Sequence, residues 1–149
     1  MNPESSEAAR AYHAELEREV VALEESGAVS RLGPSDDVPG VLTGIGVILS
    51  SSVREGCHVG LMEGAAAGAV PVVRDWPFVA GRPNSARTLF PGDWVVATPQ
   101  EAAERILAVT ASEERWLKEG SLASEHALPQ WDWPVVRQTY DRLLLGDGG

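Results

Sequence analysis

Two short apolar runs on either side of an alanine-rich stretch constrain the fold of this chain more than any other feature. Ile45–Leu49 and Val70–Val73 are rich in β-branched residues and carry no charge, which is typical of strands buried on both faces of a sheet. The stretch between them, about Val59 to Ala67, predicts a helix that ends at Gly68. Strand, helix and strand in this order predict a parallel α/β sheet.

The same alternation continues on both sides of this unit. Further helices are expected over about Glu7–Ser26, as a turn over Val38–Thr43, from Thr98-Pro99, from Ser112 and from Pro134. Two further strands are expected at Val29–Leu32 and Trp94–Val96. We therefore predict one domain over residues 1–149, an α/β fold with a Rossmann-like parallel sheet of about four strands flanked by helices.

Charge and composition disfavour several classes of protein. The net charge of −10 opposes binding to nucleic acid or to an anionic membrane surface. No stretch approaches the ~20 apolar residues of a transmembrane helix, and the polar residues 1–10 are unlike a signal peptide. The single cysteine, Cys57, rules out an internal disulfide and suits a reducing compartment, so we expect a cytoplasmic protein. The three histidines are far apart in the sequence, so no metal site is expected.

The segment from Ser50 to Val73 contains the candidate site. In an open parallel sheet, ligands bind beyond the carboxyl ends of the strands, where the N–H groups and dipole of a helix attract phosphate. Glu55 precedes the expected helix and Glu63 lies about one turn inside it, so two carboxylates bracket the helix N-terminus. Each carboxylate can accept hydrogen bonds from two hydroxyl groups. This arrangement suits a nucleoside diphosphate sugar.

Each of these residues has a simpler interpretation when it is taken alone. Ser52 and Glu55 fit a capping box at the start of the helix. Glu63 fits a solvated helix position, and His58 fits a structural or surface histidine. Cys57 fits a small buried hydrophobic residue rather than a nucleophile.

As a whole, the segment resembles the family 4 retaining glycosyltransferases, which have the GT-B fold. The match is Glu55 and Glu63 with seven residues between them, followed by Gly64-Ala65-Ala66-Ala67-Gly68-Ala69-Val70-Pro71-Val72-Val73. Similar stretches are Arg31-Leu32-Gly33, Val47-Ile48-Leu49-Ser50-Ser51-Ser52 and residues 93–103. The resemblance extends over about residues 8–144.

The resemblance implies the donor-binding, C-terminal half of such an enzyme. Glu63 would hold the ribose hydroxyls of the donor, and Glu55 would be the catalytic-site residue that holds hydroxyls of the transferred sugar. The backbone of Gly56, Cys57, His58 and Val59 would meet the sugar and the diphosphate. The resemblance further implies sugar transfer with retained configuration and no metal or other cofactor, with the leaving diphosphate stabilised by positive groups and helix N–H donors.

The sequence departs from the family at its start, where neither the acceptor-binding half nor the first strand of the donor half is found. The loop after that strand carries an arginine and a lysine in the family, whereas the only lysine here, Lys118, lies far downstream. Arg54, beside the motif, is either a partial substitute or a solvated loop residue. We therefore expect a donor half that lacks its first strand and works with a separate acceptor-binding half.

The C-terminal residues suggest a further contact. In the family the last helix crosses back to the acceptor-binding half. Trp131, Trp133, Tyr140, Leu143 and Leu144 are expected on this helix without a partner inside the chain. Exposed apolar area of this kind favours association with an acceptor half or with another copy.

Three functions stay open. The first is the donor-binding half of a glycosyltransferase. The second is a non-catalytic remnant of that fold that binds a nucleotide sugar or a protein. The third is another ligand on the same fold, because a parallel α/β unit does not by itself determine function. The glutamate pair argues against the third, and the absence of recognisable phosphate-binding cations favours the second over full activity.

Overall fold

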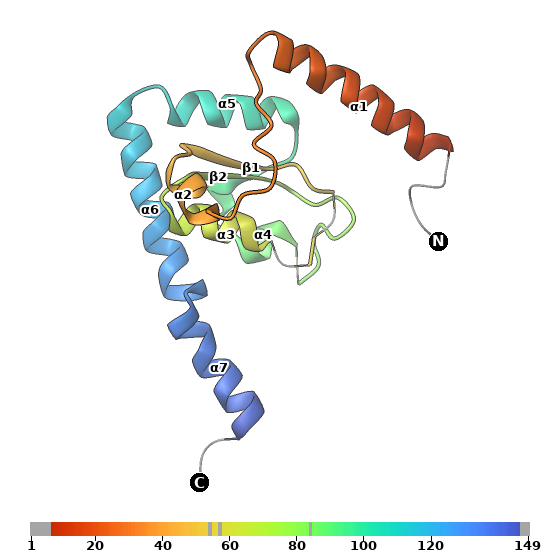
Figure 1. Cartoon of the computed structure of the whole chain (residues 1–149). Coiled ribbons are helices and arrows are strands. Elements are labelled where there is room, and N and C mark those ends of the chain that lie inside the picture. Colours follow the sequence, from red (N-terminus) through yellow and green to blue (C-terminus); the bar gives the residue numbers. More distant parts are fainter. Residues whose placement is uncertain (1–6, 54, 57, 84, 147–149) are drawn as a thin grey trace. The chain divides into compact units, whose positions relative to one another are not determined.

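The computed structural model describes residues 7–53, 55–56, 58–83 and 85–146 of the chain (Figure 1). Its contacts divide the chain into two compact units, one up to Asp36 and one from Asp37 onward. No helix in these described ranges is long and apolar enough to cross a membrane.

The first unit is a single helix with a return segment. α1 (Glu7–Glu25) is followed by Gly27, which has a φ of 76°. This is the left-handed conformation that glycine tolerates at the end of a helix. The segment after the helix is held to it by Arg31, which pairs with Glu17 at 2.8 Å and with Glu24 at 3.3 Å. The hydrogen bond to Glu17 raises the pKa of the Arg31 guanidinium above its usual value.

The strand expected at Val29–Leu32 is a wrong prediction. The structure gives these residues no regular secondary structure, and both Val29 and Leu32 are exposed. A strand is stable only when a neighbouring strand satisfies its backbone groups, and the described part of this unit contains a helix and irregular chain. The segment is held by the ion pairs of Arg31 instead.

The second unit contains a small parallel sheet, as predicted. β1 (Val47–Ser50), β2 (Val70–Arg74) and β3 (Val95–Val96) lie in the order β1-β2-β3. Val47 pairs with Val70, and Val73 pairs with Val95. The described residues therefore form three strands instead of the four expected. The α/β class and the parallel arrangement are confirmed.

Apart from residues 86–89, for which no helix was expected, the helices of this unit lie close to their expected positions. They are α2 (Val38–Thr43), α3 (Val59–Ala66), the short α4 (Ala86–Leu89), α5 (Pro99–Val109), α6 (Glu113–Trp131) and α7 (Trp133–Leu145). Thr98 caps α5 by accepting a hydrogen bond from the Glu101 amide, while the Glu101 carboxylate accepts one from the Ala97 amide. This reciprocal pair is a capping box, and it confirms the helix start expected at Thr98-Pro99.

The core lies between the sheet and the helices α3 and α6 (Figure 1). Small residues let these elements approach closely: a Cβ on Gly64 of α3 would collide with Ile48 of β1, and one on Gly120 of α6 would collide with the carbonyl oxygen of Gly68. Trp116 of α6 donates a hydrogen bond of 2.9 Å to the Gly46 carbonyl, just before β1. α6 is thus attached to the sheet along its first half, and it continues through Gly120 to Trp131.

The opposite face of the sheet is covered by α5, which contacts β2 and β3 (Figure 1). Leu49 of β1 stays 54% exposed. Since side chains alternate along a strand and Ile48 faces α3, Leu49 lies on the α5 side and Ser50 returns to the α3 side. The carboxyl end of β1 therefore presents side chains to both faces of the sheet.

Candidate functional site

The loop between β1 and α3 leads into the helix as the sequence predicts. α3 begins at Val59, and His58 is its N-cap, with Nδ1 accepting a hydrogen bond of 3.2 Å from the Leu61 amide. An imidazole nitrogen that accepts a hydrogen bond has no proton, so neutral His58 carries its proton on Nε2. The ring therefore presents a donor to the loop and an acceptor to the helix.

Glu55 lies in this loop, on the donor side of the His58 ring. Its Oε1 accepts a hydrogen bond of 2.6 Å from the Ser52 hydroxyl and lies 3.9 Å from Nε2 of His58. The Glu55 side chain is 29% exposed. The carboxylate is thus half-buried and oriented by its neighbours, although solvent or a ligand can still reach it.

The capping-box interpretation of Ser52 and Glu55 is wrong. The two side chains bond to each other, whereas the capping acceptor at the start of α3 is the imidazole of His58. The helix begins at Val59, four residues after Glu55. Glu55 therefore precedes the helix and cannot be the third residue of its first turn, as a capping box requires. Glu55 is a loop residue that Ser52 and His58 position.

Glu63 lies in the second turn of α3 and is exposed. It lines a groove of about 610 Å³, in which one wall is the α3 face of Val59, Met62, Glu63 and Ala66 and the other consists of residues from 127 to 140 of α6 and α7. The lining of this groove includes Val59, the first residue of α3, and does not include Glu55. The structure thus places the two glutamates on either side of the helix start without bringing them into one pocket.

The other residues predicted for the site belong to the same loop and helix start. Gly56 and Gly60 are exposed, and a Cβ on either would meet no atom within 4 Å. Val59 is also exposed. Backbone at these positions is accessible to a ligand. Cys57 and Arg54, which the sequence analysis singled out, lie outside the described residues.

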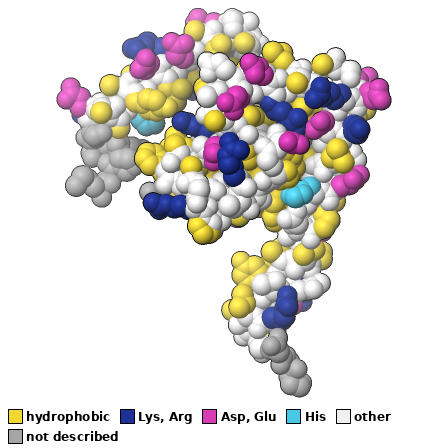
Figure 2. Space-filling model, turned by 180° about the vertical axis from the view of Figure 1, so that it is seen from behind, with side chains coloured by type: hydrophobic (Ala, Val, Ile, Leu, Met, Phe, Trp, Pro, Cys, Tyr) yellow, Lys and Arg dark blue, Asp and Glu magenta, His cyan; other side chains and the backbone are white. Residues whose placement is uncertain are grey.

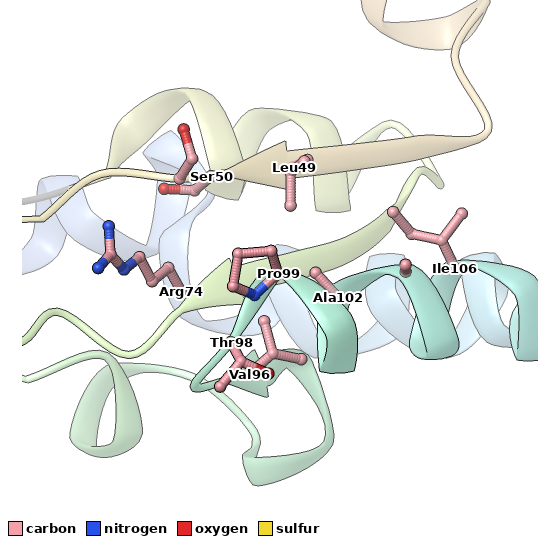
Figure 3. Close-up of a pocket in the computed structure, with 10 residues that line it drawn as sticks. Leu49, Ser50, Arg74, Val96, Thr98, Pro99, Ala102 and Ile106 are labelled. Carbon is pink, nitrogen blue, oxygen red and sulfur yellow. The ribbon is translucent and has the colours of Figure 1, made fainter.

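A second pocket, of about 360 Å³, lies on the α5 side of the sheet at the carboxyl ends of the strands (Figure 3). Its walls are mostly apolar and come from Leu49, Val96 and α5, while Ser51, Arg74 and Thr98 contribute polar groups. Arg74 is the last residue of β2 and lies at the same end of the pocket as Ser50 (Figure 3).

Arg74 is a candidate site residue that the sequence analysis missed. Among the described residues its guanidinium has no ion pair or hydrogen bond, which leaves its charge available at the carboxyl edge of the sheet. A basic residue directly after the apolar run of a central strand is the signal that could have identified it. Lys118, in contrast, is exposed on α6.

Near Arg74, the hydroxyl of Ser50 is buried and has no hydrogen-bond partner in the described structure. Ser50 lines the same pocket as Arg74. In the described ranges, no three His, Cys, Asp or Glu side chains gather closely enough to hold a metal ion.

The C-terminal aromatic residues divide into two groups. Trp131, expected on the last helix, belongs to α6, and its ring packs against those of Phe90, Trp94 and His126 at 5.5–6.5 Å. Trp133 and Tyr140 lie on α7 and are exposed, as are Leu143, Leu144 and Leu145, which are 76–79% exposed. Figure 2 shows hydrophobic side chains on this projecting C-terminal part of the second unit.

No protein-family model, no curated protein and no solved structure matches this chain. The geometry of the loop before α3 and of the adjoining groove is therefore the basis for a functional proposal.

Proposed function

We propose that this chain is the donor-binding half of a GT-B-type retaining glycosyltransferase of family 4, which transfers a sugar from a nucleoside diphosphate sugar in the cytoplasm. The observation that carries the proposal is the position of Glu55. Its carboxylate is held by Ser52 in the loop between the carboxyl end of β1 and the first turn of α3. Ligands bind at this position in open parallel sheets.

Glu55 holds hydroxyl groups of the transferred sugar. Oε1 of Glu55 accepts the hydrogen bond from Ser52, so Oε2 is left to accept hydrogen bonds from the sugar. The open backbone at Gly56 and Gly60 supports a close approach of the donor, since no described residue beyond their chain neighbours comes within 4 Å of a Cβ placed there. Glu63, exposed one turn further on, binds the ribose hydroxyls.

The diphosphate lies at the N-terminus of α3. The Leu61 amide donates its hydrogen bond to His58. The amides of Val59 and Gly60 have no acceptor within the helix, so they are available to phosphate oxygens. Arg74 supplies positive charge at the carboxyl edge of the neighbouring strand. Charge at this edge stabilises the diphosphate as its bond to the anomeric carbon breaks.

Transfer with retention requires a second protein surface. The bond between the anomeric carbon and the diphosphate oxygen breaks, and the acceptor hydroxyl adds from the same face while its proton passes to the leaving phosphate oxygen. Holding the acceptor hydroxyl against the anomeric carbon supplies roughly 7–11 kcal/mol of barrier lowering. We assign this role to an acceptor-binding half that docks on the exposed leucines of α7.

A second candidate function is a non-catalytic module of the same fold that binds a nucleotide sugar or a protein. The exposed leucines 143–145 of α7 support a protein partner. The separation of Glu55 from the groove that Glu63 lines argues against a completed donor site in the second unit alone. The two functions differ in whether transfer occurs once an acceptor-binding half is present.

Calorimetric titration of the purified chain with UDP-, GDP- and ADP-sugars tests the proposal. We expect one of them to bind with a dissociation constant near 1 mM, or about 4 kcal/mol, because the site is open and the net charge of −10 repels the ligand. Glu55→Gln should weaken this binding, whereas Glu113→Gln, on the exposed start of α6, should leave it unchanged. Binding that is indifferent to Glu55→Gln and to Glu63→Gln would place the site elsewhere.

A further inference from the structure

The groove beside α3 has the size and the lining of a ligand site. Its volume of about 610 Å³ falls within the range of small-molecule pockets, roughly 300–1,000 Å³. It lies entirely within the second unit, between α3 and the junction of α6 with α7 (Figure 1).

Three aromatic residues, Trp131, Trp133 and Tyr140, line the groove. Trp131 is fixed, since its ring packs against Phe90 at 5.7 Å and against His126 at 5.5 Å. Trp133 and Tyr140 lie two turns apart on α7, with ring centroids 6.2 Å apart and an interplanar angle of 37°. They are 61% and 54% exposed, respectively. Exposed aromatic rings in a groove provide surface on which a planar ring can stack.

The charged residues of the groove restrict what it can hold. Among the described residues, its lining includes the carboxylates of Glu63 and Asp132 and no lysine or arginine. One oxygen of Asp132 accepts a hydrogen bond of 2.8 Å from the Trp133 amide, and Glu63 is exposed. Such a lining repels phosphate but accepts hydrogen bonds from hydroxyl and amino groups. The groove therefore suits a neutral, planar ligand that carries hydroxyl groups.

One end of the groove coincides with the start of α3. Val59 is the first residue of this helix and lines the groove, and Glu63 lines it four residues further on, about 6 Å along the helix axis. A ligand with a phosphate at the helix N-terminus can thus extend along α3 so that a hydroxyl-bearing group reaches Glu63. A planar group attached beyond it then lies between α3 and the rings of α7.

We propose that this groove binds the nucleoside of the sugar donor, with its base stacked on Trp133 and Tyr140. This inference rests on the proposed function, because it takes the diphosphate to lie at the start of α3. It adds a residue pair that recognises the base, outside the loop that contains Glu55. The recognition comes mainly from stacking, which tolerates different bases.

Titration of the full chain with UDP, GDP and ADP, and separately with inorganic diphosphate, tests the inference. The variants are Trp133→Leu and Tyr140→Leu, which keep an apolar side chain but remove the ring. Val135→Ala is the control, because Val135 is 40% exposed on the same helix outside the groove. Each aromatic variant should weaken the best nucleoside diphosphate about tenfold and leave inorganic diphosphate unchanged. Thermal unfolding of each variant verifies that it is folded.

The possible results separate the two proposals. If a nucleoside diphosphate binds and loses affinity in Glu63→Gln but not in Trp133→Leu or Tyr140→Leu, the base lies elsewhere and the inference fails while the proposed function stands. If no nucleotide binds to the folded chain, both fail. If the aromatic variants change the oligomeric state measured by sedimentation and leave nucleotide binding unaltered, the groove is a contact between copies of the chain, which also overturns the inference.

Discussion

The hydroxyl of Ser52 donates a hydrogen bond of 2.6 Å to Oε1 of Glu55, three residues further along the loop. The bond orients a carboxylate that has no strand or helix to hold it. His58 lies 3.9 Å from the same oxygen, while its other ring nitrogen caps α3. The position of Glu55 is therefore coupled to the start of the helix.

Ser52→Ala should weaken binding of a nucleoside diphosphate sugar about fivefold. A hydrogen bond to a partly exposed carboxylate contributes about 1 kcal/mol, and its loss lets Glu55 rotate away from the sugar. Ser51→Ala is the matched control, since Ser51 is the exposed neighbour. Calorimetric titration of both variants measures the effect, and equal affinities would show that Ser52 does not position the carboxylate for the donor.

Arg74→Met should reduce the affinity for nucleoside diphosphates by about tenfold, because a charge-assisted hydrogen bond contributes about 1.5–3 kcal/mol. Lys118→Met removes the same charge from an exposed position on α6 and should have little effect. The two variants have the same net charge, so their comparison separates a local contact from long-range attraction. A similar loss in both variants would mean that only the net charge matters.

His58→Ala should destabilise the fold by about 1 kcal/mol, because the first turn of α3 loses its capping acceptor. His58→Asn should recover most of this stability, since asparagine is a good N-cap residue. The midpoint of urea unfolding measures both changes. If asparagine proves as destabilising as alanine, the imidazole stabilises the loop in some way other than capping.

Gly120→Ala should destabilise the second unit by about 3 kcal/mol or more, since the added Cβ would collide with the backbone carbonyl of Gly68. Gly60→Ala is a matched control in another helix, because a Cβ there meets nothing within 4 Å. It should raise the stability by up to about 1 kcal/mol through helix propensity. Thermal unfolding followed by circular dichroism compares the two, and a harmless Gly120→Ala would mean that α6 can move away from the sheet.

The local structure around the central helix was predictable because it depends on neighbouring residues. The apolar run before Ser50, the alanine-rich stretch of α3 and the run from Val70 each indicate their own element. The start of α5 was equally predictable, since the side chains of Thr98 and Glu101 accept hydrogen bonds from backbone amides within one turn. The close approach of α6 to Gly68 was not predictable, because it brings Gly120 against a carbonyl group that lies 52 residues earlier in the chain.

The candidate site was predictable in its residues and only partly in its geometry. The spacing of Glu55 and Glu63 located them on either side of a helix start, and the structure agrees. The spacing of Ser52 and Glu55 suggested a capping box, which is wrong because the helix begins later and His58 caps it. Arg74 was missed although it directly follows the apolar run of β2, because the sequence does not show that this arginine lacks a partner in the fold.

By itself the sequence determined the α/β class, the parallel order of the central elements and the position of the helix start, because periodicity and capping act over a few residues. Tertiary structure alone decided that Val29–Leu32 forms no strand. It also decided that Trp131 packs into an aromatic cluster while Trp133, two residues later, stays exposed beside a groove. A strand needs a partner and a buried ring needs neighbours, and both are supplied by residues distant in the sequence.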